Sequence, residues 1–281
     1  MCLLIAGDAY GTNFFAERYE GYPFDFLAQK ALGGPRGKGE WLGSVDVCLL
    51  GNSGSIDLGF EDEKRIFDGP GADFTILENA FQILDPDTGD PTGLFSAELM
   101  FVEVSTDGEI FARFPTLTTN TQPIHASEYD GLDPSQYSGF AGVNPTYANV
   151  DLNDINPFDS AVSGGDAFDL SDIADNALVL SGNVDLSDIR WVRLVDIIGD
   201  GSVLDSKGNP IYDAYQYEND PDDPEDDDPI PINGADIDAL AVINGLDGTV
   251  VPEPGTLVLF AVSLPVLLAS ARSFHNRKTV S

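Results

Sequence analysis

Positive charge is the most evident shortage in this chain. Its 281 residues include 13 lysines and arginines against 48 aspartates and glutamates, and the formal net charge is −35 at pH 7. A surface this negative repels phosphate backbones, so nucleic acid is excluded as a partner. Such a surface suits a domain that must stay soluble outside the cell, or one that gathers divalent cations.

Histidine and cysteine are scarce as well. The sequence has two histidines, His125 and His275, and two cysteines, Cys2 and Cys48. A Ser-His-Asp triad or a histidine metal cluster would depend on His125 alone, so most hydrolase designs are excluded. Cys2 lies in an apolar start and Cys48 in the strand-like VDVCLLG, so no disulfide framework is predicted.

The chain also lacks a sustained 3.6-residue apolar period. It contains short segments of strand character, separated by turns rich in Asp, Asn, Gly and Pro. The clearest are SGSIDLGF, ADFTILENAF, ELMFVEVSTDGEIFARF, IRWVRLVDII and GADIDALAVIN. This pattern predicts a mainly β protein, an antiparallel β-sandwich. One helical turn is expected in FDLSDIADNAL (168–178).

Alternation assigns the faces of two of these segments. Ile56, Leu58 and Phe60 alternate with Asp57 and Gly59, which is typical of a half-buried strand. In residues 98–114 the alternation runs up to Asp107-Gly108 and resumes beyond it, so this segment is predicted to be a hairpin.

Domain boundaries follow from composition. Residues 1–24 form an N-terminal segment whose apolar start is either a buried first strand or the remnant of a truncated signal peptide. Residues 25–249 form the sandwich. Within it, YENDPDDPEDDDPIP (217–231) carries charge of one sign and many prolines, so it is predicted to be a disordered surface loop. Residues 250–281 are a separate C-terminal segment.

The C-terminal segment has the pattern of a membrane helix. Residues 255–271 carry no charge, which makes them a short candidate span, and Pro265 is better tolerated in a membrane helix than in a soluble one. The basic tail 272–281 contains Arg272, Arg277 and Lys278. Under the positive-inside rule this tail stays cytoplasmic and the acidic body lies on the far side. A buried core helix fits less well, because the segment is apolar all round.

Val251-Pro252-Glu253-Pro254, the apolar segment and the basic tail together resemble the PEP-CTERM sorting signal of exported bacterial proteins. The resemblance implies recognition by an exosortase near the Pro-Glu-Pro motif and removal of the helix after a transient stay in the inner membrane. It implies a membrane-anchored precursor that ends at the cell surface or in the extracellular matrix.

The body is similar to a recurring family of PEP-CTERM surface proteins. The matching stretches are GSIDLGF, DGPGADFTILENAF, VEVSTDG, FDLSDI, VRLVDIIGDG, PIYDAY and GADIDALAVIN. The resemblance implies a galactose-binding-like jelly roll, a fold shared with carbohydrate-binding modules. The acidic segment 217–231 departs from the family pattern just before the last strand.

Strand carboxylates are the first candidates for chemistry. Glu78 and Glu103 lie within predicted strands, where an acid needs a partner, and Arg113 across the hairpin could pair with Glu103. Arg193 and Asp196 are expected to brace a sheet edge. GNSGS (51–55) precedes a strand instead of a helix, so it is a turn and no nucleophile elbow.

Calcium is the predicted cofactor, if the chain has one. Two Asp-rich turns could direct oxygen ligands at an ion. The candidate ligands are Asp85, Asp87 and Asp90 in one turn, and Asp205, Asn209 and Asp213 in the other. Both turns lack EF-hand spacing, and both are equally typical of solvated turns without an ion.

The sequence therefore predicts an exported, sorted surface protein with a non-catalytic structural or carbohydrate-binding body. Exopolysaccharide or other glycans are the expected partners besides the exosortase and the membrane. Aromatic rings on loops could stack on sugars, and the candidates are Tyr137, Phe140, Tyr147, Tyr212, Tyr215 and Tyr217. The alternative is a secreted glycoside hydrolase that uses two carboxylates.

Overall fold

The computed structural model describes residues 12–38, 46–125, 131–215 and 234–248. The chain divides into two compact units, Met1–Asp247 and Gly248–Ser281, and the described residues belong almost entirely to the first. The acidic segment 217–231, the sorting motif 251–254, the predicted membrane helix 255–271 and the basic tail lie outside the described residues. Within the described part, no helix is long and apolar enough to cross a bilayer.

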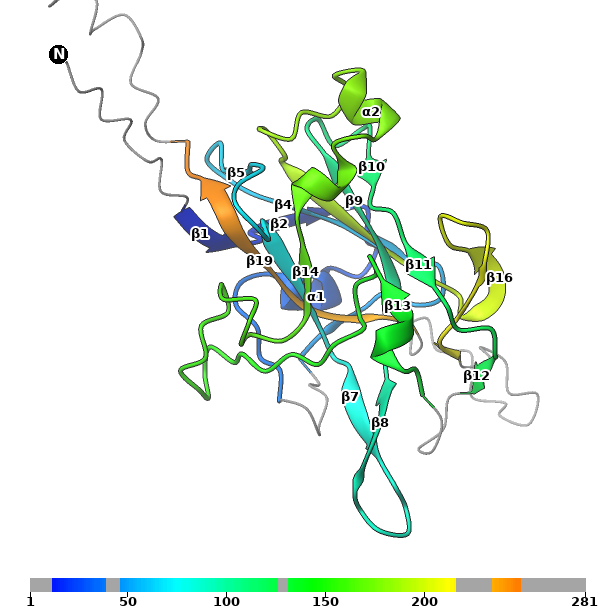
Figure 1. Cartoon of the computed structure of the whole chain (residues 1–281). Helices are drawn as coiled ribbons and strands as arrows, with labels where there is room; N and C mark the ends of the chain where they lie inside the picture. The colour runs from blue at the N-terminus through cyan, green and yellow to red at the C-terminus, as the bar shows by residue number, and fades with distance from the viewer. Residues whose placement is uncertain (1–11, 39–45, 126–130, 216–233, 249–281) are drawn as a thin grey trace, which may run out of the picture. The chain divides into compact units, whose positions relative to one another are not determined.

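The described residues are mainly β, with antiparallel sheets and few helices, as the sequence predicts. One six-stranded sheet contains β1 (Thr12–Phe15), β19 (Asp236–Leu246), β6 (Phe74–Glu78) and β14 (Asp166–Phe168) in that order, with β3 (Cys48–Leu49) and β5 (Arg65–Ile66) also paired to β19. A five-stranded sheet runs β10 (Ala112–Arg113), β9 (Met100–Ser105), β15 (Trp191–Asp196), β4 (Ser55–Gly59) and β2 (Arg18–Glu20). Figure 1 shows β19 crossing the molecule beside β6.

Smaller elements complete the body. Four two-stranded sheets join β7 (Phe81–Leu84) to β8 (Pro91–Ser96), β11 (Leu117–Thr118) to β13 (Tyr137–Ser138), β12 (Ile124–His125) to β18 (Ala214–Tyr215), and β16 (Asp200–Leu204) to β17 (Pro210–Tyr212). The short helices are α1 (Asp25–Ala28) and α2 (Ala177–Leu180), with 3-10 turns η1 (Gln29–Ala31), η2 (Pro134–Gln136) and η3 (Leu170–Ile173). The single turn expected in 168–178 is therefore two short helices, η3 and the start of α2.

One apolar core lies between the two large sheets. The six-stranded sheet contributes Phe74, Ile76, Leu240 and Val242, and the five-stranded sheet contributes Ile56, Leu58, Val102, Val104, Val192 and Leu194. Both large sheets thus contribute side chains to the same core, and the predicted sandwich arrangement of these sheets stays a prediction. Its jelly-roll connectivity stays a prediction.

Strand β19 is buried on both faces. Besides the central core, Ala239 and Ala241 pack with Leu77 on the opposite face of the sheet, against Phe15 and Phe158. This explains why GADIDALAVIN reads as a nearly continuous apolar run instead of an alternating one. Strands β1 and β2 pair with β19 and β4, so the sandwich includes residues that the sequence analysis placed before it.

The outer face of the five-stranded sheet is a row of charges. The register aligns one residue from each strand in the order Glu20, Asp57, Arg193, Glu103 and Arg113. The signs alternate from Asp57 to Arg113, which favours cross-strand pairing. Asp57 was expected on an exposed face, but it is only 9% exposed because the neighbouring strands and the side chain of Arg193 cover it.

Gly59 makes room on this face for a large aromatic side chain. A Cβ at Gly59 would lie 2.6 Å from the ring of Trp191. The guanidinium of Arg18 then lies 4.1 Å from the centre of the same ring, across the position that Gly59 leaves open. A glycine at this point of the strand therefore serves the packing of its two neighbours.

Candidate functional site

A pocket of about 480 Å³ opens beside β13 and β14. Its lining combines aromatic rings with polar groups. The residues are Phe114, Pro115, Pro134, Tyr137, Ser138, Gly139, Phe140, Val143, Asn144, Gly165, Asp166, Ala167, Phe168 and Asp172. Ser138 and Asp172 are exposed, whereas Asp166 is buried. We call this cavity the Asp166 pocket.

Asp166 holds the loop that forms one wall of the pocket. Its Oδ2 accepts the backbone N–H of Val143 at 2.8 Å, and its Oδ1 accepts the side-chain amide of Asn144 at 2.7 Å. Burial raises the pKa of Asp166 to about 6, although these hydrogen bonds oppose the rise. Both carboxylate oxygens of Asp166 already accept hydrogen bonds, so its role is to stabilise the loop at Val143 and Asn144 that lines the pocket.

The predicted sugar-stacking rings have different environments. Tyr137 and Phe140 line the Asp166 pocket, but both are buried, and the Tyr137 hydroxyl donates to the carbonyl of Tyr212 at 2.6 Å. Tyr147 instead lines a second cavity of about 400 Å³. Expecting Tyr137 and Phe140 to be open loop rings was wrong, because they belong to a small apolar core. Tyr212 is partly buried against that core, while the side chains of Tyr215 and Tyr217 lie outside the described residues.

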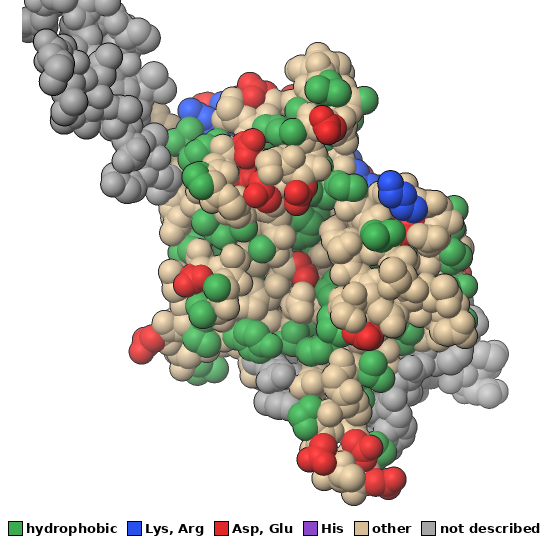
Figure 2. Space-filling view, in the orientation of Figure 1, with side chains coloured by type: hydrophobic (Ala, Val, Ile, Leu, Met, Phe, Trp, Pro, Cys, Tyr) green, Lys and Arg blue, Asp and Glu red, His purple; other side chains and the backbone are tan. Residues whose placement is uncertain are grey.

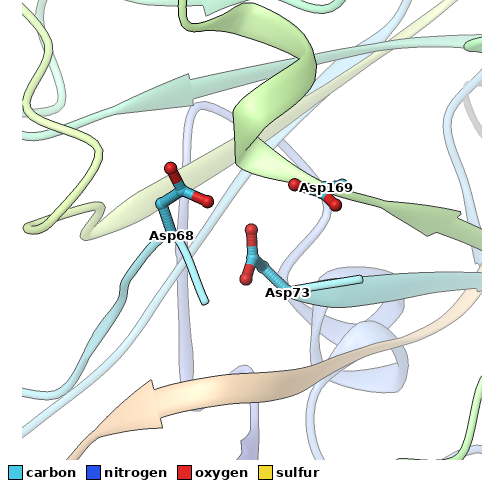
Figure 3. A group of neighbouring side chains, drawn as sticks. All are labelled: Asp68, Asp73 and Asp169. Atoms are coloured by element: carbon cyan, nitrogen blue, oxygen red, sulfur yellow. The ribbon is translucent and has the colours of Figure 1, made fainter. Parts of the chain in front are cut away.

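Three aspartates that the sequence analysis did not single out come together near the start of β6. Asp68, Asp73 and Asp169 each offer a carboxylate oxygen within 4.8 Å of the others, and Figure 3 shows the three carboxylates converging from different segments. We call them the aspartate triad. It could hold a metal ion.

The buried member of the triad already has a structural role. Asp73 Oδ1 accepts the backbone N–H of Gly69 and the amide of Asn244, and Oδ2 accepts the N–H of Leu170 at 2.7 Å. Asp169 caps η3 through the N–H of Ser171. These contacts tie three segments together without an ion. The DGPGAD motif (68–73) was the sequence signal for two members; the third comes from FDLSDI, a connection that spacing alone cannot reveal.

The first predicted calcium turn is the tip of the β7–β8 hairpin. Asp85 Oδ1 accepts the backbone N–H groups of Asp87 and Thr88 at 2.9 Å each, and these bonds lower the pKa of Asp85. Figure 2 shows the acidic side chains of this tip facing outward. Asp85, Asp87 and Asp90 do not form a converging group among the described carboxylates. The geometry is that of a solvated Asx turn.

The predicted ligands of the second calcium turn lie in two different places in the structure. Asp205 Oδ1 accepts the N–H of Asn209 at 2.8 Å, and its Oδ2 accepts the Asn209 amide at 2.9 Å and the N–H of Thr118 at 2.9 Å. Burial raises the pKa of Asp205, but these donors outweigh it and bring the value to about 2. Asp213 does not join them; it is buried and accepts the N–H of Leu99 at 3.0 Å.

The strand ion pairs are partly as predicted. Arg113 Nε donates to Glu103 at 2.7 Å, which confirms the cross-strand pair. The expectation that Arg193 and Asp196 brace a sheet edge is wrong, because β15 lies in the middle of the five-stranded sheet. Arg193 instead binds Asp57 on the neighbouring strand with two hydrogen bonds of 2.6 and 2.7 Å, while Asp196 lies buried and accepts the N–H groups of Ser53 and Ala235. Consecutive strand positions face opposite sides, and three positions separate these two residues, so they point apart.

Glu78 lies at the end of β6, 2% exposed, with its Oε1 accepting the backbone N–H of Asp236 at 3.2 Å. Burial, with the charges of Asp236 and Glu98, raises its pKa well above the usual range.

Comparison of the chain with family models, with curated proteins and with solved structures finds no match. The function must therefore be inferred from these sites and from the sequence.

Proposed function

We propose that the chain is an exported bacterial surface or exopolysaccharide-associated protein, sorted and processed through its C-terminal segment, whose sandwich binds or scaffolds carbohydrate without catalysing a reaction. The observation that carries the carbohydrate role is the Asp166 pocket. A pocket with exposed polar side chains, and with aromatic rings buried in its lining, suits a ligand rich in hydroxyl groups, such as a sugar.

The exposed polar groups of the pocket are the ones available to a ligand. Asp172, Ser138 and Asn144 are exposed, but the side-chain amide of Asn144 already donates a hydrogen bond to the buried Asp166. A carboxylate such as Asp172 accepts hydrogen bonds from hydroxyl groups, and charged acceptors make stronger hydrogen bonds than neutral ones. Asp172 is therefore the side chain that we expect to bind the ligand.

Binding of the full chain to a glycan array tests this role. Asp172→Ala should weaken binding at least about tenfold, in line with loss of a hydrogen bond to a charged group. Asp175→Ala is the matched control, because Asp175 is exposed three residues away and does not line the pocket. Absence of glycan binding by the unaltered chain, or an equal loss in both variants, would reject the pocket as a carbohydrate site.

A carboxylate-dependent glycoside hydrolase is the second candidate, because Asp166 and Asp172 share one pocket and the pKa of Asp166 is raised to about 6. The occupied oxygens of Asp166 argue against it. The discriminating measurement is release of reducing ends from polysaccharides. Turnover that Asp172→Asn abolishes would replace the binding role by a catalytic one.

The sorting role rests on the C-terminal sequence. A rigid Pro-Glu-Pro before an apolar segment presents an extended chain at the membrane surface, where a membrane-embedded transpeptidase could bind it. Glu253→Ala should leave the precursor unprocessed in the membrane, while Glu225→Ala, in the acidic segment, should mature normally. Fractionation and immunoblotting of the producing cells check this, and normal maturation of the Glu253 variant would contradict it.

A further inference from the structure

The Asp166 pocket carries charge of one sign. Two of its lining residues are charged, the buried Asp166 and the exposed Asp172, and none of the described residues that line it is a lysine or an arginine. The ion pairs among the described residues involve neither of these two aspartates. The pocket therefore holds negative charge that no basic side chain compensates.

The hydrogen-bond partners of Asp166 are neutral. They are the backbone N–H of Val143 at 2.8 Å and the side-chain amide of Asn144 at 2.7 Å. Asp166 is 8% exposed, so water screens its charge less than it screens that of a surface acid. Above the pKa of Asp166, which burial raises to about 6, this carboxylate adds to the negative field in the pocket.

Further acids flank the lining residues in the sequence. Asp133 directly precedes Pro134, which lines the pocket, and it caps η2. Asp169 belongs to the aspartate triad, and its carbonyl accepts the backbone N–H of Asp172 at 3.0 Å. Asp172 is thus only one 3-10 turn away from the triad along the chain. These acids extend the negative charge beyond the pocket itself.

The one base beside a lining residue in the sequence has its charge matched elsewhere. Arg113 precedes Phe114, but consecutive positions of an extended chain face opposite sides. The Arg113 guanidinium lies 4.0 Å from the centre of the Phe101 ring, and its Nε donates to Glu103 at 2.7 Å. Arg113 therefore belongs to the charge row of the five-stranded sheet and does not line the pocket.

The aromatic walls of the pocket strengthen its field. Four buried rings line it: Phe114, Tyr137, Phe140 and Phe168. Apolar walls have a low dielectric constant, and they focus the field of like charges into the cleft between them. A cationic ligand is therefore attracted to this pocket and an anionic ligand is repelled from it. The net charge of −35 on the whole chain acts in the same direction.

A metal ion is not the cation that fits this pocket. Among the described carboxylates, the three whose oxygens converge are those of the aspartate triad, and neither Asp166 nor Asp172 belongs to it. A cavity of about 480 Å³ has instead the size of a site for a small organic ligand.

We propose that the Asp166 pocket selects saccharides with a free, protonated amino group over neutral and acidic ones, with Asp172 as the acceptor of the ammonium group. The proposal rests on the proposed carbohydrate role and names the class of sugar. An ammonium group donates charge-assisted hydrogen bonds to a carboxylate, which are about twice as strong as neutral ones. An acidic sugar would instead bring a second negative charge close to Asp172.

The experiment compares two trisaccharides that differ in one group. One is fully N-acetylated, and the other is identical except for a free amine on its central sugar. Isothermal titration calorimetry of the full chain in non-ionic detergent micelles, in a buffer in which the amine is protonated, should show at least about tenfold tighter binding of the amine form. This preference should shrink at about 1 M salt, where the Debye length falls to about 3 Å.

Asp172→Asn is the test variant, because it keeps the shape of the side chain and removes its charge. It should lose most of the preference for the amine form, whereas Asp172→Glu, which keeps the charge, should retain a preference. Asp175→Asn removes an exposed charge outside the pocket. This control should keep the full preference, since it tests general attraction to the acidic surface.

Ser138→Lys tests the same field without altering Asp172. Ser138 is an exposed lining residue, so the variant places a positive charge in the pocket. It should weaken binding of the amine form more than binding of the acetylated form.

The proposal would be overturned by equal affinities for the two trisaccharides, by a preference that survives Asp172→Asn, or by equal losses of preference in Asp172→Asn and Asp175→Asn. If the acetylated form binds and the amine adds nothing, the selectivity fails and the carbohydrate role stands. Binding of neither trisaccharide also overturns the selectivity, and the glycan array then decides separately whether the carbohydrate role stands.

Discussion

Asp166 illustrates what burial does to a single carboxylate. Its pKa rises from 3.8 to about 6 in the folded chain. The folded state therefore holds a proton more tightly than the unfolded chain, and the stability from this group is fully present below pH 4 and lost as the pH passes 6. The shift corresponds to about 3 kcal/mol of unfolding free energy.

Asp166→Asn should remove this pH dependence, because an amide keeps the shape and does not ionise. We expect the free energy of unfolding of the variant, relative to the unaltered chain, to rise by up to about 3 kcal/mol between pH 4 and pH 7. Urea denaturation at a series of pH values measures it. Any constant offset from the altered contact with Asn144 cancels in this comparison; a difference that does not change with pH would contradict the assignment.

The ion-pair partner of a residue could be predicted only where the two residues lie close together in the sequence. The Glu103–Arg113 pair lies within one hairpin, so alternation and a turn signal were enough to predict it. The partner of Arg193 depends on which strands flank β15, and that order is set by distant contacts. The same limit applies to the aspartate triad, because Asp169 is far from Asp68 and Asp73 in the sequence.

At the scale of elements, the charge row across the five-stranded sheet contains two arginines whose ion pairs can be compared. Arg193 and Arg113 both pair with a carboxylate on a neighbouring strand. The side chains of Asp57 and Glu103 are each 12% exposed, while those of Arg193 and Arg113 are 32% and 44% exposed. Arg193 donates two hydrogen bonds to Asp57, and Arg113 donates one to Glu103. Loss of Arg193 leaves Asp57 beside Glu20 in the row, whereas loss of Arg113 leaves Glu103 beside Arg193. A covered carboxylate that keeps no opposite charge next to it in the row costs more than one that does.

We therefore expect Arg193→Met to lower the free energy of unfolding by about 2–3 kcal/mol, since it leaves Asp57 covered and unpaired. Arg113→Met should lower it by about 0.5 kcal/mol. Methionine keeps most of the side-chain length, so the packing of Arg193 on Phe111 and of Arg113 on Phe101 is only partly lost. Equal losses by chemical denaturation would show that the row acts through apolar packing alone.

The strands themselves were the most predictable elements. The segments around Ile56, Phe74, Val102, Leu194 and Leu240 all form strands where apolar alternation or a β-branched run indicated them. Short strands such as β3, β5 and β14 carry too few residues to show a period, and they exist because β19 and β6 offer them partners. Their positions could not be read from local pattern.

At the scale of the whole molecule, β19 joins most of the six-stranded sheet. It pairs with β1, β3, β5 and β6 and contributes Leu240 and Val242 to the central core. A chain ending at residue 233 should therefore show no cooperative thermal transition, because four strands lose their partner. A chain ending at Asp247, the boundary of the first compact unit, should melt cooperatively. Circular dichroism distinguishes the two, and a cooperative melt of the shorter chain would contradict this role.

The position of β19 in the order of synthesis also sets when folding can begin. A chain that is synthesised from its N-terminus presents β1, β3, β5 and β6 long before Asp236 is available. Until then β1, β3 and β5 have no partner strand in the six-stranded sheet. That sheet can therefore assemble only after residues 236–246 have been made, so its closure follows the synthesis of almost the whole body.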